Sequence, residues 1–200
     1  MRENVAEVAG INAYLQRTRT ALAALQPLDI DAIAHRLHDV RLAGGTVFLF
    51  GNGACAALSE HMATDFIKSD LAVSDDPQRP RLRASSLNAN SAMLTALGND
   101  QEYELIFSEQ LRGLAGPADM AFGLSASGAS PNVLRALEVA RSAGAGTACF
   151  TGKITLEPPI AALVDLAVVV ESDAIDVIED AHVAVHHALL RRYLELCGDE

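Results

Sequence analysis

The sequence predicts an α/β protein with one parallel, five-stranded sheet flanked by helices. Five short runs of aliphatic, β-branched and aromatic residues recur along the chain, and a helical pattern follows most of them. Two of these runs end in Gly- or Ser-rich turns, as strands of parallel sheets do where they lead into helices. Half of the 200 residues are apolar, which is enough for a sizeable core.

Two helices are expected before the first strand. Apolar residues recur there at intervals of three, four and seven, and Pro27 interrupts the pattern. Asp29 or Asp31 is expected to cap the second helix, which ends before the Gly pair at 44–45. The apolar positions of the first helix are Val5, Val8, Ile11, Leu15, Leu22 and Leu25.

These helices set the expected organisation of the chain. Because they precede the sheet, residues 1–44 are expected to form a helical arm that contacts another subunit. Ordinary packing within one subunit is the alternative. Residues 45–200 are expected to form the sheet domain, and the two ranges together one structural unit, since no linker or internal repeat separates them.

The rest of the chain alternates strands and helices. The run at 46–50 is continuously apolar, which is typical of a strand buried on both faces. Pro131 suits the first turn of a helix, and Gly144 suits its end. Strands are predicted at 46–50, 82–87, 120–124, 147–151 and 163–170, helices at 55–68, 101–114, 131–143 and 175–196, and a loop at 70–82.

The charge balance excludes several classes of partner. Fifteen Lys and Arg against 26 Asp and Glu give a net charge of −11, which disfavours nucleic acid as a partner. The one basic stretch, 79–83, is short and interrupted by Pro80. No apolar run approaches the roughly 20 residues of a membrane span. Three widely spaced cysteines do not form a disulfide framework, so a cytoplasmic location is expected.

Two strand-to-helix turns have the composition of a binding site. Residues 51–55 read Gly-Asn-Gly-Ala-Cys, and residues 125–130 read Ser-Ala-Ser-Gly-Ala-Ser. Glycines let the backbone approach a ligand, and three hydroxyls at a helix N-terminus favour an anion without any cationic side chain. Simple helix capping is the alternative. No Gly-Lys-Ser/Thr follows either turn and the third glycine of a dinucleotide fingerprint is missing, so a sugar phosphate is favoured over a nucleotide.

Histidines and carboxylates share faces of two predicted helices. His61 and Asp65 are four residues apart, which places them one above the other. On the last helix, His187 lies about 80° from Glu179 around the axis, whereas His186 lies about 20° from it. Periodicity alone does not choose between the two histidines. Two imidazoles with carboxylates are a ligand set that suits zinc.

Three stretches together resemble the sugar isomerase (SIS) domain family, and its phosphoheptose isomerases most closely. They are residues 50–53 (Phe-Gly-Asn-Gly), 94–100 (Leu-Thr-Ala-Leu-Gly-Asn-Asp) and 124–133 (Leu-Ser-Ala-Ser-Gly-Ala-Ser-Pro-Asn-Val). The similarity covers about residues 45–190. It implies an SIS fold and a homotetramer with active sites between subunits. It also implies an isomerase that converts sedoheptulose 7-phosphate to a D-heptose 7-phosphate through an enediol, for nucleotide-activated heptose synthesis.

The resemblance also implies roles for individual residues. Cys55 stands where the family usually has Ser, and the Glu-Pro-Pro of residues 157–159 stands where relatives usually have a Gly-Gly loop. Asp100 and Asp176 match residues near the sugar hydroxyls, with capping of a helix as the alternative for each. The implied substrate-binding residues are Asn52, Gly53, Cys55, Asp100, Ser125, Ala126, Ser127, Ser130, Asp176 and Glu179.

By the same resemblance, His61, Asp65, Glu179 and His187 hold a zinc ion, and Asp65 and His187 form the acid–base pair. The family has Glu at the position of Asp65 and Gln at that of Glu179. The extra carboxylate shifts the preference toward harder ions such as manganese. The alternatives are a non-enzymatic SIS module, of the kind that controls replication initiation, and an isomerase of another phosphosugar.

Overall fold

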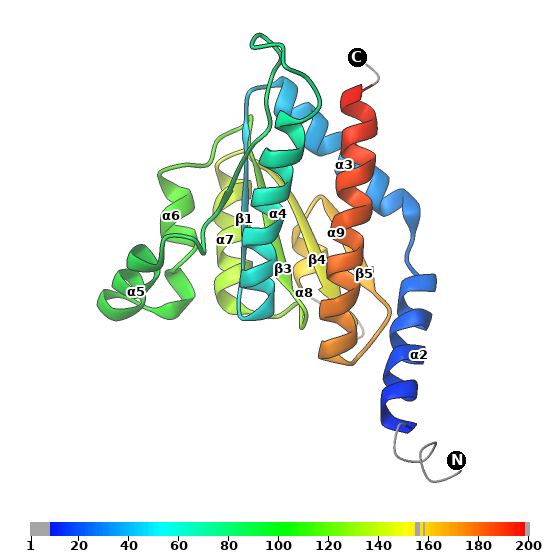
Figure 1. The fold of residues 1–200 in the computed structure, drawn as a ribbon. Coiled ribbons are helices and arrows are strands. Elements are labelled where there is room, and N and C mark those ends of the chain that lie inside the picture. Colours follow the sequence, from blue (N-terminus) through cyan, green and yellow to red (C-terminus); the bar gives the residue numbers. More distant parts are fainter. Residues whose placement is uncertain (1–8, 155–156, 158, 199–200) are drawn as a thin grey trace.

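The structure is a computed structural model that describes residues 9–154, 157 and 159–198. It confirms the α/β class, with five parallel strands in the order β2-β1-β3-β4-β5 (Figure 1). The predicted strands are all present, each within a few residues of the expected bounds. They are β1 (Thr46–Gly51), β2 (Arg83–Ser86), β3 (Met120–Ser125), β4 (Gly146–Gly152) and β5 (Leu166–Val170).

The central strands explain why the sequence reads as continuous apolar runs. Every residue of β3 and β4 is buried, since helices cover both faces of the sheet. One face carries α3 (Pro27–Leu42), α4 (Ala54–Leu71) and α9 (Ile175–Gly198), which pack on strand residues such as Leu49 and Phe122. The other face carries α7 (Pro131–Ser142), which packs with α6 (Ser108–Arg112) on Phe48 and Phe50.

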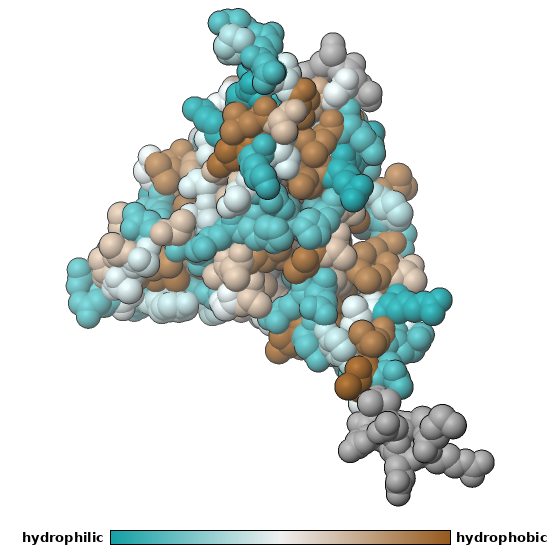
Figure 2. Space-filling model, viewed as in Figure 1, coloured by the Kyte–Doolittle hydropathy of each residue, from teal (hydrophilic) through white to brown (hydrophobic). Residues whose placement is uncertain are grey.

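The two N-terminal helices differ in how they pack. Helix α3 belongs to the core, where Ile33 and Leu37 are fully buried. Helix α2 (Ala9–Ala23) lies along α9 and is anchored by hydrogen bonds from Tyr14 to Asp180 and from Arg17 to Asp173. Its outer face leaves apolar side chains exposed, visible in brown toward the lower right of Figure 2. The positions Val5 and Val8 lie outside the described residues.

The prediction that Asp29 or Asp31 caps the second helix is wrong. Helix α3 begins at Pro27, which is earlier than a cap at Asp29 or Asp31 allows, and Gln26 occupies the N-cap position. Pro27 therefore starts this helix rather than only ending the one before it. A proline suits the first turn because its missing N–H would have no partner there.

The helix predicted at 101–114 is also wrong. The segment holds a 3₁₀ turn, η1 (Tyr103–Leu105), and the short α6. A helix that was not predicted, α5 (Ser91–Asp100), precedes them, and the Asn90 side chain caps it by accepting a hydrogen bond from the Met93 amide. No residue of α5 is fully buried, and Leu94 and Leu97 pack against the core only partly buried.

The predicted strand 163–170 starts too early. Leu163 ends a short helix, α8 (Pro159–Leu163), and β5 begins at Leu166. Asp165 fixes this boundary, because its carboxylate accepts hydrogen bonds from the backbone N–H and the hydroxyl of Thr147 on β4.

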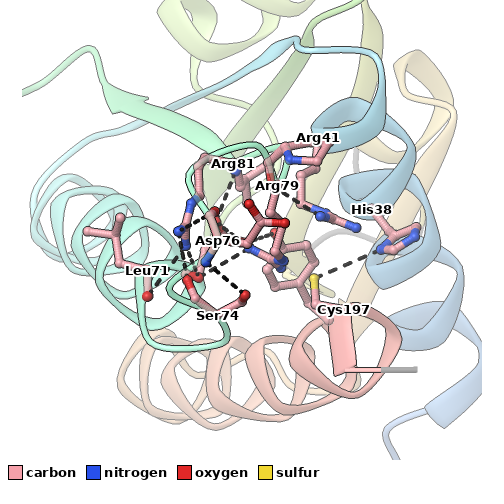
Figure 3. A network of polar contacts seen from close by, with 12 residues as sticks. His38, Arg41, Leu71, Ser74, Asp76, Arg79, Arg81 and Cys197 are labelled. Carbon is pink, nitrogen blue, oxygen red and sulfur yellow. Dashed lines mark hydrogen bonds and ion pairs between the residues drawn. The ribbon is translucent and has the colours of Figure 1, made fainter. Parts of the chain in front are cut away.

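A buried polar network holds the long loop after α4 (Figure 3). The Asp70 carboxylate is 1% exposed and accepts hydrogen bonds from Arg79, from the Leu82 amide and from the hydroxyl of Tyr193. Arg81 donates to the Ser74 carbonyl within the loop. The loop is thereby fixed to the C-terminal ends of α4 and α9.

Candidate active site

The two turns singled out in the sequence lie side by side at the carboxyl edge of the sheet. The chain runs from β1 outward to β2 and then returns to the other side of β1 at β3. This reversal is a topological switch point, where open α/β sheets bind ligands. The first turn follows β1 at residues 52–53 and the second follows β3 at residues 126–130, so both lie at the same edge of the sheet.

The glycines of the first turn are required by its shape. Gly53 has a φ of +57° at the N-cap of α4, a conformation that glycine adopts without strain. A Cβ on Gly51 would lie 2.7 Å from the carbonyl oxygen of Leu124 on β3. These two residues let α4 start directly above the sheet, next to the second turn.

The three serines of the second turn converge as the sequence predicts. Ser125 Oγ lies 3.4 Å from Ser127 Oγ and 3.1 Å from Ser130 Oγ. The Gly128 amide donates to Ser125 Oγ, and Gly128 itself has a φ of +67°. Helix α7 begins immediately afterwards at Pro131, so its positive N-terminal end faces the hydroxyl cluster.

A reciprocal amide pair joins the two turns. The Asn52 side chain donates to Asn132 Oδ1 at 2.9 Å, and the Asn132 side chain donates back to Asn52 Oδ1 at 2.8 Å. The Tyr103 hydroxyl also donates to Asn52 Oδ1. Asn132 and Tyr103 were not predicted as site residues, although Asn132 stands directly after Ser130-Pro131, in the motif that carried the family resemblance.

A cavity of about 180 Å³ lies beside the first turn, between α4 and α9. Cys55, Glu179 and His182 line it. Burial raises the pKa of the Cys55 thiol, and the nearby Glu179 carboxylate raises it further. Burial also lowers the pKa of His182 to about 4, so both side chains are neutral near pH 7.

Further along the same helix pair, four side chains form a group that could hold a metal ion. His61 and Asp65 come from α4, and His186 and His187 come from α9. The Asp65 Oδ2 atom lies 3.0 Å from His61 Nε2, 3.1 Å from His186 Nε2 and 3.9 Å from His187 Nε2. One ligand atom from each of the four residues lies within 4.8 Å of the others.

The imidazoles around Asp65 keep its carboxylate ionised. Partial burial acts to raise the pKa of Asp65, but the hydrogen bond with His186 and the charges of the surrounding imidazoles outweigh it and lower that pKa. Burial lowers the pKa of His186, against the opposing effect of Asp65. The ionised carboxylate is the form of Asp65 that binds a metal ion.

The structure brings together three of the four residues expected to bind metal, namely His61, Asp65 and His187. Glu179 lies at the separate cavity with Cys55. Asp176 is exposed in the first turn of α9, where its carboxylate accepts from the Val177 amide. Asp100 is exposed at the end of α5, which projects away from α9 (Figure 1). It does not cap the helix that follows, so that alternative is wrong.

The arrangement combines two kinds of chemistry in one chain. A cluster of hydroxyls and amides at a helix N-terminus suits a phosphate. A carboxylate within hydrogen-bonding distance of imidazoles can hold a metal ion and move protons. No helix in the described part of the chain is both long enough and apolar enough to cross a membrane.

Comparison with protein families and curated proteins gives a consistent match. Residues 11–152 match the model of the SIS domain family. A phosphoheptose isomerase of Trichlorobacter lovleyi is 38% identical over 88% of this chain and 85% of its own length. A phosphoheptose isomerase of Solidesulfovibrio magneticus is 36% identical over 81% of this chain and 76% of its own length.

Solved structures agree with the sequence comparison. A phosphoheptose isomerase from Neisseria gonorrhoeae superposes with a TM-score of 0.80 at 26% identity and covers 96% of this chain and 97% of its own. One from Francisella tularensis gives a TM-score of 0.82 at 24% identity, covering 98% and 100%. The second match concerns the fold alone.

Proposed function

The chain belongs to the SIS-domain family and, within it, to the phosphoheptose isomerases, and we propose that it converts sedoheptulose 7-phosphate to D-glycero-D-manno-heptose 7-phosphate or a related heptose 7-phosphate. The product would feed the synthesis of a nucleotide-activated heptose. The observation that carries this proposal is the Asp65 carboxylate in contact with imidazoles of two helices, in a chain 38% identical to a phosphoheptose isomerase.

The serine turn would hold the phosphate. Ser125, Ser127 and Ser130 present their hydroxyls together at the N-terminus of α7. These groups and the helix dipole donate to an anion without a positive side chain, which explains how a protein of net charge −11 accepts a phosphorylated substrate. Ala126 and Gly53 would contribute backbone N–H groups beside them.

The reaction moves a proton between C1 and C2 through an enediol, so it needs a base and an acid. We assign these roles to Asp65 and His187. The lowered pKa of Asp65 keeps the carboxylate free to accept a proton at neutral pH. The His187 side chain is 51% exposed, which leaves it open to a substrate, whereas His186 is fully buried.

A divalent metal, which we propose to be zinc, would be held by His61, Asp65 and His187. The three side chains fit such an ion, because two imidazoles and a carboxylate from adjacent helices already converge. The family resemblance implies Glu179 as a fourth ligand, but in the structure its side chain lines the separate cavity with Cys55. When bound, the ion would polarise the substrate carbonyl as a Lewis acid.

Other residues would complete the site and its setting. We assign Asn52, Cys55, Asp100, Asp176 and Glu179 to the binding of the substrate. A homotetramer with sites between subunits is supported by the apolar face of α2, where Ile11 is 60% and Leu15 57% exposed.

A cytoplasmic location is supported by the three cysteines, which are all unpaired.

The proposal is tested by incubating the protein with sedoheptulose 7-phosphate in D2O and following the sugar by NMR. We expect a heptose 7-phosphate with deuterium at C2, and deuterium at C1 of the recovered ketose. Absence of conversion would contradict the substrate assignment. A variant lacking the proposed base, Asp65→Asn, is the matched control for a contaminating isomerase.

A further inference from the structure

His186 is a histidine at a fully buried position, with its Nε2 atom directed at the metal-binding group. We propose that His186 is a ligand of the metal ion in this chain, together with His61, Asp65 and His187, and that Glu179 is not. This inference rests on the metal binding proposed above and specifies its ligand set. It gives three imidazoles and one carboxylate, where the resemblance implies two imidazoles and two carboxylates.

The separations between the ligand atoms support this set. Zinc bonds of about 2.0–2.1 Å in a tetrahedron place neighbouring ligand atoms about 3.3 Å apart. Asp65 Oδ2 lies 3.0 Å from His61 Nε2 and 3.1 Å from His186 Nε2. His187 Nε2, at 3.9 Å from the same oxygen, needs only a small rotation of an exposed ring to join them.

The rings are also arranged around a common point. The ring centroid of His61 lies 5.1 Å from that of His186 and 5.4 Å from that of His187. The His186 and His187 centroids are 5.0 Å apart. The three imidazoles and the carboxylate are thus close enough together for one ion to contact all four.

Glu179 is poorly placed for the same ion. It precedes His187 by eight residues, about 12 Å along the helix axis at 1.5 Å per residue. Its side chain lines the cavity with Cys55 and His182 near the start of α4, whereas Asp65 is almost three turns further along that helix. Glu179 is therefore better placed to meet the sugar than the metal.

His186 is a polar side chain at a fully buried position. Its ring lies edge-on to Phe66 on α4, in a position where an apolar side chain would satisfy the core. A buried imidazole is unfavourable unless its nitrogens are partnered. Its Nδ1 atom is buried without a hydrogen-bond partner in the described residues, and its Nε2 faces Asp65. Coordination would satisfy Nε2 through a bond stronger than a hydrogen bond.

The ligand set has a consequence for metal choice. Imidazole ligands suit zinc, copper, iron and nickel, whereas carboxylates suit manganese and magnesium. Replacing Glu179 by His186 in the set therefore reverses the shift toward harder ions that the sequence suggests.

The experiment is X-ray absorption at the zinc edge of the zinc-loaded wild-type protein, with metal affinity measured for His186→Gln and Glu179→Ala. We expect scattering from three imidazoles, a loss of affinity of 10-fold or more in His186→Gln and a change below about 2-fold in Glu179→Ala. Circular dichroism and thermal melting of both variants establish that each is folded.

Two imidazoles in the wild-type spectrum, or wild-type affinity in folded His186→Gln, would overturn the proposal, because His186 would then only orient Asp65. A protein that binds no zinc would also overturn it. Isomerase activity is measured separately with sedoheptulose 7-phosphate. An inactive protein that binds zinc through three imidazoles would contradict the proposed reaction and leave the ligand set standing.

Discussion

Asp65 on α4 and His186 on α9 lie 3.1 Å apart, although 121 residues separate them in the chain. The contact joins the two helices at the point where His61 and His187 also meet the same carboxylate oxygen. Asp65 is thus the residue that contacts all three imidazoles, and substitutions of Asp65 should affect metal binding and proton transfer together.

Replacing Asp65 by Asn should lower turnover by about 10²-fold or more, because an amide neither accepts the substrate proton nor supplies a charged ligand. Asp65→Glu, which restores the residue usual in the family, should retain more activity. Steady-state kinetics on sedoheptulose 7-phosphate would measure both. Wild-type turnover in Asp65→Asn would remove its catalytic role.

His187→Ala should also lower turnover by roughly 10²-fold or more if this imidazole is the acid. The comparison is with His35→Ala, which removes a partly exposed histidine that pairs with Asp31 on α3, a helix that contributes none of the proposed site residues. Equal activity in the two variants would show that His187 does not take part in proton transfer.

Ser127→Ala and Ser130→Ala should each raise KM for the phosphorylated sugar several-fold, with a smaller effect on kcat, since each hydroxyl would contact the non-reacting phosphate. Ser142→Ala, at the far end of the same helix α7, is the matched control. If all three variants gave the wild-type KM, the phosphate would have to bind elsewhere.

The Asn52–Asn132 pair should couple the two turns energetically. Each single alanine variant leaves a polar partner without its hydrogen bonds, so each should destabilise the protein by about 1–3 kcal/mol. The double variant should lose less than the sum of the two, by on the order of 1 kcal/mol. Urea unfolding of the four proteins measures the coupling, and strict additivity would show that the pair is not a unit.

His182 should make the protein sensitive to acid. Its pKa falls from 6.5 when exposed to about 4 in the folded state because burial disfavours the charged ring. Between these values the unfolded chain binds the extra proton, so stability is full above about pH 6.5 and declines as the pH falls toward 4. The loss attributable to His182 should reach roughly 2–3 kcal/mol near pH 4.5.

The control for His182 is His182→Phe, which keeps an aromatic ring beside Phe150. Urea unfolding of metal-free protein at pH 7 and pH 4.5 should show a smaller acid-induced loss in the variant than in the wild type. The same loss in both proteins would mean that other groups cause the acid sensitivity.

The sequence predicted those parts of the molecule that periodicity and turn chemistry encode. The strand residues 47–51 are continuously buried, so the apolar run there was unambiguous. The serine turn was predicted because three serines directly follow a buried strand and precede a helix, which is where a parallel sheet places an anion-binding turn. Helix α5 was missed because its apolar side is short: Leu94 and Leu97 pack against the core, and both are only partly buried.

The contacts between distant segments could not be predicted from the sequence. The resemblance favoured His187, and only the packing of α4 on α9 shows that His186 also reaches Asp65. Asn132 pairs with Asn52, 80 residues away, which no local pattern indicates. Such contacts depend on how far each helix is rotated about its axis, and spacing along one helix does not determine that.

Our central claim is that this protein is a metal-dependent heptose phosphate isomerase. The most direct test is to titrate metal-free protein with zinc while measuring conversion of sedoheptulose 7-phosphate. We expect negligible turnover without metal, a linear rise with added zinc and a break at about one ion per chain. Full turnover in metal-free protein, or none at any zinc concentration, would contradict the assignment of the Asp65 group as the catalytic centre.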